Sequence, residues 1–133
     1  MSLPSPRTLL IVDDSAAVRM VLKQHLHDRG FNVVEAENAQ HALERLKYWK
    51  VDLVITDVNM PGMNGIALLE HLRQAPKAEL RTLPVFLLTG DHFIETDRCL
   101  KAGAAGFLRK PVAQQELVTR VEEHFAGAHD AAK

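Results

Sequence analysis

The sequence predicts an α/β fold in which helices cover both faces of one parallel sheet. Five short apolar segments, rich in residues that favour strands, alternate with segments whose apolar residues recur at helical spacing. The predicted strands are residues 8–12, 31–36, 51–57, 83–89 and 107–109. Short loops connect strands and helices, and right-handed crossovers between parallel strands then favour a doubly wound, three-layer sandwich.

The strand at residues 51–57 is the most informative of the five. Apolar residues dominate its first part, as in a central strand whose two faces are both buried. The run stops at Asp57, and the segment MPGMNG at residues 60–65 brings the proline and glycines of a loop. Asp57 is therefore predicted at the carboxyl end of a buried strand, where open α/β sheets place their ligands.

The first two helices are predicted from turn residues and apolar stripes. A helix begins at Ser15 and is closed by Gly30 as a C′ residue. Its expected inward stripe is Val18, Val21, Leu22 and Leu26. Asn38 is the expected N-cap of the second helix. The stripe of that helix is Ala39, Ala42, Leu43 and Leu46.

The second half of the chain continues the alternation less regularly. A third helix follows Asn64 or Gly65, and residues 74–82 are expected to form a polar loop. The inward residues of the third helix are Ile66, Leu69 and Leu72. A short, poorly patterned helix is expected at residues 93–102, and the last helix begins near Ala113. Leu117, Val121 and Phe125 lie on one face of the last helix.

Length and composition indicate one domain, with an irregular lead-in at residues 1–7, a folded part at 8–126 and a frayed tail at 127–133. A single cysteine excludes an internal disulfide and a thiolate metal cluster. The net charge of −1 gives no reason to expect nucleic acid or a membrane as a direct partner. No apolar stretch reaches the roughly 18 residues of a bilayer-spanning helix, and no signal peptide is evident, so we expect a cytoplasmic location.

Polar residues end four of the five predicted strands. They are Asp13, Asp14, Asp57, Thr89 and Lys110. Because parallel strands share one carboxyl edge, these side chains should meet. At about 4 Å and an effective dielectric near 20, each pair of carboxylates repels by about 4 kcal/mol at most. Lys110 supplies one compensating charge, and Mg²⁺ with oxygen ligands is the natural further complement.

Such a site suits a phosphoryl group that arrives at a carboxylate nucleophile, Asp57. Taken singly, each of the other residues has a plainer explanation. Asp14 could cap a helix, Thr89 could simply end a strand, and Lys110 could face solvent. Their joint placement at four strand ends favours the site.

Together these motifs resemble the receiver domain of two-component response regulators. The resemblance covers residues 8–125 and implies a flavodoxin-like (βα)5 fold with strand order 2-1-3-4-5. The residues that carry it are Asp13-Asp14, Asp57 with MPGMNG at residues 60–65, Thr89, and Lys110-Pro111.

The resemblance also implies a role for each residue. Asp57 would accept a phosphoryl group from a histidine kinase or a histidine phosphotransfer protein, and Thr89 and Lys110 would hold that group. The ligands of Mg²⁺ (or Mn²⁺) would be Asp13, Asp14, Asp57 and the backbone carbonyl of Asn59. The chain would be a signalling phosphoacceptor that catalyses only its own phosphorylation and dephosphorylation.

The family couples phosphorylation to a switch. The hydroxyl at the Thr89 position moves toward the phosphoryl group, and an aromatic residue of the fifth strand, here Phe107, turns inward. Constitutive inward packing of Phe107 is the alternative. The responding face would comprise the fourth and fifth strands, the helix at residues 93–102 and the last helix.

Two positions at the mouth of the pocket bear on the lifetime of the phosphoryl group. Asn59 lies two residues after the nucleophile, and Asp91 two residues after Thr89. Small polar or acidic groups there leave room for an attacking water, so we expect a short-lived phosphoryl state. Gly90 stands where the family usually has alanine, a modest departure.

Three rival interpretations use the same residues differently. A phosphatase with an aspartate nucleophile needs an acid where this chain has Asn59. A flavodoxin-type FMN carrier would place a phosphate beside Asp13 and Asp14, which would repel it without a metal. A phosphorylation-independent docking module would not need the complete set of pocket residues.

The context is open at this stage. The chain could be a free-standing regulator or a receiver excised from a larger regulator or hybrid kinase. Its downstream partner would be a separate protein or a fused output domain. It would be a monomer or a weak dimer that forms on phosphorylation.

Overall fold

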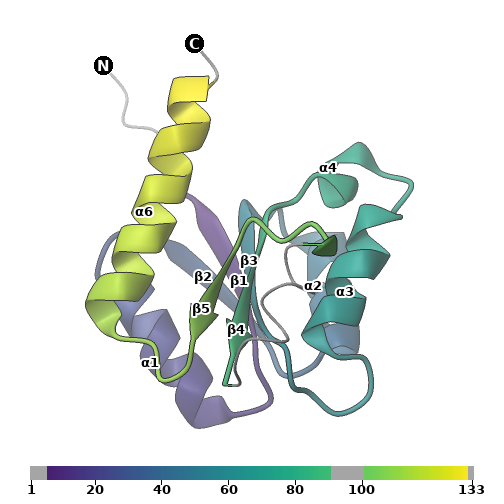
Figure 1. Cartoon of the computed structure of the whole chain (residues 1–133), viewed down its shortest axis with the longest axis horizontal. Coiled ribbons are helices and arrows are strands. Elements are labelled where there is room, and N and C mark those ends of the chain that lie inside the picture. Colours follow the sequence, from purple (N-terminus) through teal and green to yellow (C-terminus); the bar gives the residue numbers. More distant parts are fainter. Residues whose placement is uncertain (1–5, 91–100, 132–133) are drawn as a thin grey trace.

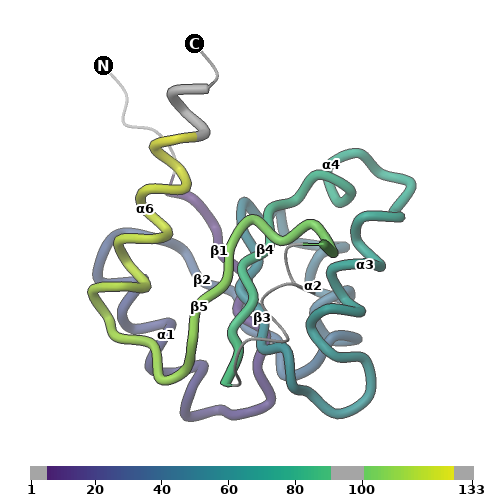
Figure 2. The backbone as a smooth tube through the Cα atoms, in the orientation of Figure 1, coloured from purple at the N-terminus to yellow at the C-terminus, as the bar shows by residue number. Residues whose placement is uncertain are grey.

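The computed structural model describes residues 6–90 and 101–131. Within them, five parallel strands form one sheet in the order β2-β1-β3-β4-β5. The strands are β1 (Thr8–Val12), β2 (Asn32–Ala36), β3 (Leu53–Asp57), β4 (Val85–Thr89) and β5 (Gly106–Arg109). Figure 2 follows the chain from β1 outward to β2 and then back across the sheet through β3 and β4 to β5. The predicted fold class and strand order are confirmed.

Helices cover both faces of this sheet. They are α1 (Ala16–His27), α2 (Ala39–Tyr48), α3 (Gly65–Arg73), the single turn α4 (Ala78–Arg81) and α6 (Gln114–Ala131). Helices α1 and α6 lie on one side of the sheet, and α2 and α3 lie on the other (Figure 1). Side chains alternate along a strand, so Leu9 and Ile11 of β1 join the core under α1 and α6. Leu10 and Val12 join the core under α2 and α3.

Three helices start at capping residues that stand a few positions after strand ends. The side chains of Ser15, Asn38 and Asn64 accept hydrogen bonds from the backbone N–H groups of Val18, His41 and Ala67, respectively. Each such cap contributes about 1 kcal/mol to stability. The caps fix where α1, α2 and α3 begin, and so keep short the loops that border the carboxyl edge of the sheet.

Four expectations need correction. Val21 is 49% exposed, because α1 contacts the sheet along the line of Leu22 and Leu26 and Val21 lies on its flank. The expected loop at residues 74–82 contains the helical turn α4. Helix α6 continues to Ala131, past the expected end of the folded part at residue 126. The end of α1 differs by one position, since the cap residue is Asp28 and Gly30, with φ of 90°, is the second residue after it.

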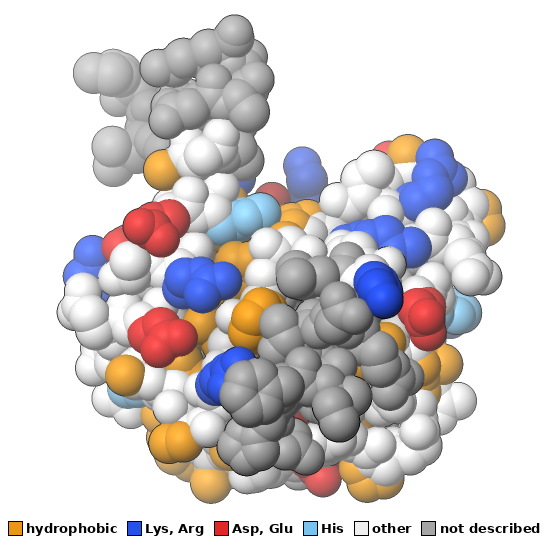
Figure 3. All heavy atoms as spheres, in the orientation of Figure 1, with side chains coloured by type: hydrophobic (Ala, Val, Ile, Leu, Met, Phe, Trp, Pro, Cys, Tyr) orange, Lys and Arg blue, Asp and Glu red, His pale blue; other side chains and the backbone are white. Residues whose placement is uncertain are grey.

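Some expectations lie outside the described residues. Most of the helix expected at residues 93–102 and the position of Asp91 belong to this group. In the described part of the chain, no helix has the length and apolar character that crossing a membrane requires. On the face seen in Figure 3, acidic and basic side chains are interspersed, in keeping with the near-neutral net charge.

Gly65 lies against the backbone of Asp57, and a substitution there tests this close approach. A Cβ built on this residue would collide with the carbonyl oxygen of Asp57, at the start of a helix that packs under β3. We therefore predict that Gly65→Ala lowers the free energy of unfolding by about 1–3 kcal/mol, as overpacking does in a core. Urea denaturation measures this change.

Gly127 provides the matched control. It lies in α6, and a Cβ built there meets nothing within 4 Å. Gly127→Ala should stabilise the protein by up to about 1 kcal/mol through helix propensity alone. Equal effects of the two substitutions would contradict the close approach at Gly65.

Candidate functional site

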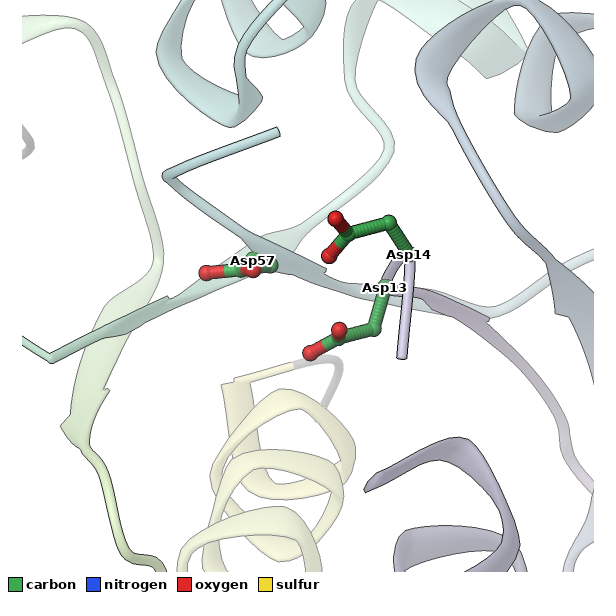
Figure 4. Close-up of side chains that lie close together, drawn as sticks. All are labelled: Asp13, Asp14 and Asp57. Carbon is green, nitrogen blue, oxygen red and sulfur yellow. The ribbon is translucent and has the colours of Figure 1, made fainter. Parts of the chain in front are cut away.

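The ends of the strands bring the predicted residues to one edge of the sheet. Asp13 and Asp14 follow β1, Asp57 ends β3, Thr89 ends β4, and Lys110 follows β5. Asp57 pairs with Leu88 in the register between β3 and β4, so Thr89 stands one position further along the neighbouring strand. Figure 4 shows the carboxylates of Asp13, Asp14 and Asp57 converging from the ends of the two adjacent strands.

Lys110 holds two of these carboxylates together. Its Nζ lies 3.1 Å from Oδ2 of Asp13 and 3.1 Å from Oδ2 of Asp57. Its backbone N–H donates to the carbonyl oxygen of Thr89 at 2.8 Å, which continues the pairing of β5 with β4. The peptide bond between Lys110 and Pro111 is cis. With its two contacts, the Lys110 ammonium bridges Asp13, which follows β1, and Asp57 of β3 from the far side of β4.

Asp57 is only 4% exposed, and both of its carboxylate oxygens are engaged. Oδ2 faces Lys110, and Oδ1 accepts a hydrogen bond from the backbone N–H of Asn59 at 3.2 Å. The backbone behind it is equally fixed, because the N–H of Val58 donates to the carbonyl of Leu88 at 2.9 Å. The nucleophile predicted from the sequence thus sits on the rigid end of a central strand.

Three carboxylates form a group that could hold a metal ion. One oxygen from each of Asp13, Asp14 and Asp57 lies within 4.8 Å of the others. Against the single ammonium of Lys110, the three carboxylates leave a formal charge of −2 on the group. All the donors are carboxylate oxygens, which Mg²⁺ and Mn²⁺ bind in proteins. The residues present therefore fit the predicted divalent cation.

The surroundings shift the pKa values of the two central groups. Burial raises the pKa of Asp57, and the nearby Asp13 carboxylate raises it further, while Lys110 and the Asn59 N–H act in the opposite direction. Burial alone would lower the pKa of Lys110, but its hydrogen bonds to Asp13 and Asp57 outweigh burial and raise it. Lys110 therefore stays protonated, and the ionised Asp57 carboxylate is destabilised until a further cation joins it.

The remaining predicted residues stand near this centre with different exposure. Thr89 is fully buried at the end of β4, next to the β3 end that carries Asp57. The Asn59 side chain is exposed at the mouth, and the proposed metal-binding role of its carbonyl stays a prediction. Phe107 is half-buried and packs against the core on the α2 and α3 side. Asp91 lies outside the described residues.

Arg19 and Glu35 were not predicted from the sequence as residues of the site. The Arg19 side chain donates from Nη1 to the carbonyl oxygen of Asp13 at 2.6 Å and from Nε to the Glu35 carboxylate at 3.1 Å. A basic residue one helical turn after Ser15, beside an acid near the end of β2, was the available signal. Without knowledge that β1 pairs with β2, the sequence does not show that Arg19 can contact both Asp13 and Glu35.

The chain matches the response regulator receiver domain family over residues 9–122. It belongs to that family. The match includes residues of all five strands, and every strand-end residue described above falls within it. The chain is thus a receiver domain of two-component signalling, a class of signalling proteins rather than classical enzymes.

Named relatives fit this assignment. The receiver domain is 39% identical to the chemotaxis protein CheY-3 of Vibrio cholerae over 119 residues, 88% of this chain and 90% of that protein. It is also 39% identical to the sensory/regulatory protein RpfC of Xanthomonas campestris over 111 residues, 83% of this chain. That match spans only 15% of the length of RpfC. A crystal structure of a response regulator receiver protein from Pseudomonas putida superposes with a TM-score of 0.82 at 31% identity, covering 91% of this chain and 99% of that one.

The raised pKa of Asp57 generates a prediction about the pH dependence of stability. A group whose pKa is higher in the folded state stabilises that state below its unfolded pKa, and this contribution is lost as the pH rises through the folded pKa. Asp57→Asn removes the ionised form. Without divalent cations, we expect Asp57→Asn to be more stable than wild type near pH 7, with the difference shrinking toward about pH 4. Urea denaturation across this range measures it.

Asp28→Asn is the control, because it removes the same charge from an exposed residue at the end of α1. It measures the effect of losing one negative charge away from the pocket. Mg²⁺ at about 100 times its Kd should then stabilise wild type by about 2.7 kcal/mol, and Asp57→Asn much less. A pH-independent difference between wild type and Asp57→Asn would contradict the raised pKa.

Proposed function

We propose that Asp57 is the phosphoacceptor of this receiver domain and takes its phosphoryl group from the phosphohistidine of a histidine kinase or a histidine phosphotransfer protein. One observation carries the proposal. Asp57 is a nearly buried carboxylate at the end of β3, held between the Lys110 ammonium and two further carboxylates. Two buried acids and a third beside them at the surface need a partner for their charge.

The chemistry follows from this arrangement. An oxygen of the Asp57 carboxylate forms a bond to phosphorus while the P–N bond of phosphohistidine breaks, and the departing imidazole takes a proton from solvent. Lys110, already 3.1 Å from Oδ2 of Asp57, balances charge on the incoming phosphoryl oxygens. Thr89, at the adjacent strand end, offers its hydroxyl to the same group. Mg²⁺ held by Asp13, Asp14, Asp57 and the Asn59 carbonyl would neutralise the remaining negative charge.

Signal output is proposed to follow from Thr89 and Phe107. Movement of the Thr89 hydroxyl toward the phosphoryl group would leave space behind β4, and the half-buried Phe107 on β5 is adjacent to it. The face made by β4, β5 and α6 would then bind a downstream protein or a fused output domain. The alternative function, docking without phosphorylation, uses the same fold but needs no reaction at Asp57.

Phosphorylation by a small donor distinguishes these two functions. With acetyl phosphate and Mg²⁺, we expect intact mass spectrometry to show one phosphoryl adduct on wild type and none on Asp57→Asn. Chelation of Mg²⁺ should abolish the adduct. Lys110→Ala should slow its formation by at least about 10²-fold, as loss of one transition-state charge contact does.

Arg109→Ala is the control for Lys110→Ala, because Arg109 is an exposed cation one residue earlier. If no adduct forms and beryllofluoride also fails to bind, the docking function replaces this proposal.

Decay of the same adduct over time tests its lifetime. Arginine at position 59 should shield the phosphoryl group, so Asn59→Arg should slow the decay, and an unchanged rate would exclude any role of Asn59 in lifetime.

A protein donor must cover the surface beside the pocket mouth. A groove of about 560 Å³ there runs between α1 and the segment after β5, and Lys110 forms part of its wall. Its other walls are mainly apolar, including Val18, Val21 and Val112. Val21 is half exposed at this place, and exposed apolar patches mark sites of association. Because the donor histidine has to approach Asp57, we assign this groove to the phosphodonor protein.

The groove leads to a prediction that separates protein donors from small ones. Val21→Glu should lower kcat/KM for transfer from an autophosphorylated histidine kinase by about tenfold or more, since interface hot spots contribute about 1–2 kcal/mol or more. Phosphorylation by acetyl phosphate should not change. Met20→Glu, on the same helix and 66% exposed but outside the groove, is the control. If Val21→Glu lowers the rate of phosphorylation equally with the kinase and with acetyl phosphate, the substitution disturbs the pocket, and the groove is not the docking site.

A further inference from the structure

We infer that Arg19 is a positioning residue for the metal site, which fixes the backbone position from which the Asp14 side chain extends, through the peptide group between Asp13 and Asp14. The inference rests on the proposed function, because it concerns the affinity of the same three carboxylates for a divalent cation. Arg19 itself reaches none of those carboxylates in the described structure; its contacts are to the Asp13 carbonyl and to Glu35.

Asp13 and Asp14 are held very differently. Every polar atom of Asp13 has a partner. Its N–H donates to Ala36, Oδ1 accepts from the Ser15 N–H at 2.9 Å, and Oδ2 faces Lys110. The Asp14 carboxylate is exposed, and among the described residues no hydrogen bond or ion pair to it is found. The described contacts therefore restrain Asp14 only through the backbone that carries its side chain.

Arg19 fixes that backbone. The carbonyl oxygen of Asp13 belongs to the same planar peptide group as the N–H of Asp14. Rotation about that peptide bond is prevented by its partial double-bond character. The hydrogen bond of 2.6 Å from Nη1 of Arg19 therefore holds the plane from which the Asp14 side chain departs. The N–H of Asp13, which belongs to the preceding peptide group, donates to the carbonyl oxygen of Ala36 of β2, so the peptide groups on both sides of Asp13 are hydrogen-bonded.

The guanidinium is itself held in place. Arg19 is only 15% exposed, and its Nε donates to Glu35 on β2, which also accepts from Lys23 at 3.3 Å. The planar Arg19 guanidinium thus donates to the Asp13 carbonyl and to the Glu35 carboxylate at the same time. A lysine has one nitrogen on a flexible stem and cannot reproduce both contacts in this geometry.

Positioning and simple charge predict opposite signs for the change in metal affinity. A cation near three carboxylates repels Mg²⁺, so Arg19→Gln should tighten metal binding if only the charge of Arg19 matters. If Arg19 positions Asp14, Arg19→Gln should weaken binding by about tenfold, in the range typical for residues that orient metal ligands. Arg19→Lys keeps the charge and should also weaken binding.

The experiment is Mn²⁺ binding to the unphosphorylated protein, measured by electron paramagnetic resonance, for wild type, Arg19→Gln and Arg19→Lys. Arg45→Lys is the matched control, since Arg45 donates to the carbonyl of Glu35 and has no contact with Asp13. We expect an unchanged Kd for Arg45→Lys. The backbone amide resonance of Asp14 should shift in both Arg19 variants and stay in place in Arg45→Lys.

The outcomes are distinct. Unchanged or tighter binding in the Arg19 variants, with wild type binding Mn²⁺, would overturn this inference and leave the proposed function intact. Absence of binding in wild type would overturn the metal site and the inference with it. If Arg19→Gln does not fold, Arg19→Lys alone tests the same point, because it keeps the charge and loses the double contact, and weaker Mn²⁺ binding with a shifted Asp14 amide is again expected.

Discussion

The site depends on the contact of one ammonium with two buried carboxylates. Lys110 comes 97 residues after Asp13 in the chain, yet its Nζ lies 3.1 Å from Asp13 and 3.1 Å from Asp57. Without it, the ends of β1 and β3 would place like charges together in surroundings poorer in water than the surface, where repulsion is several-fold stronger. The ammonium relieves this repulsion only in part. The sheet is therefore built to tolerate a net negative pocket, which is a requirement for binding a cation there.

The fold and the residues of the pocket could be predicted because both follow from local patterns. An apolar run that stops at a polar residue marks a strand end, and parallel topology brings strand ends together whatever their distance in the chain. The strand order came from the resemblance to receiver domains, since periodicity does not specify which strands are neighbours. Thr89 and Lys110 could be placed at the edge for the same reason as Asp57.

What sequence reasoning missed depends on side-chain direction or on contacts across the sheet. Val21 has the spacing of a core residue, but it lies on the flank of α1, toward the segment after β5. Arg19 needs both the pairing of β1 with β2 and the path of α1 before its two contacts become visible. Residues 126–131 lack an apolar stripe, yet three of the six are alanine, whose high helix propensity continues α6 without one.

The pocket combines one fixed and one adjustable carboxylate around Asp57. Asp13 is fully buried and saturated with partners, so its orientation is part of the fold. Asp14 is exposed, and its constraint comes through the backbone alone. If all three carboxylates were rigidly held, their mutual repulsion would destabilise the fold whenever no cation is present. The exposed Asp14 carboxylate can instead turn toward water. The division between Asp13 and Asp14 therefore reconciles a stable fold with a pocket that is complete only when its charge is balanced.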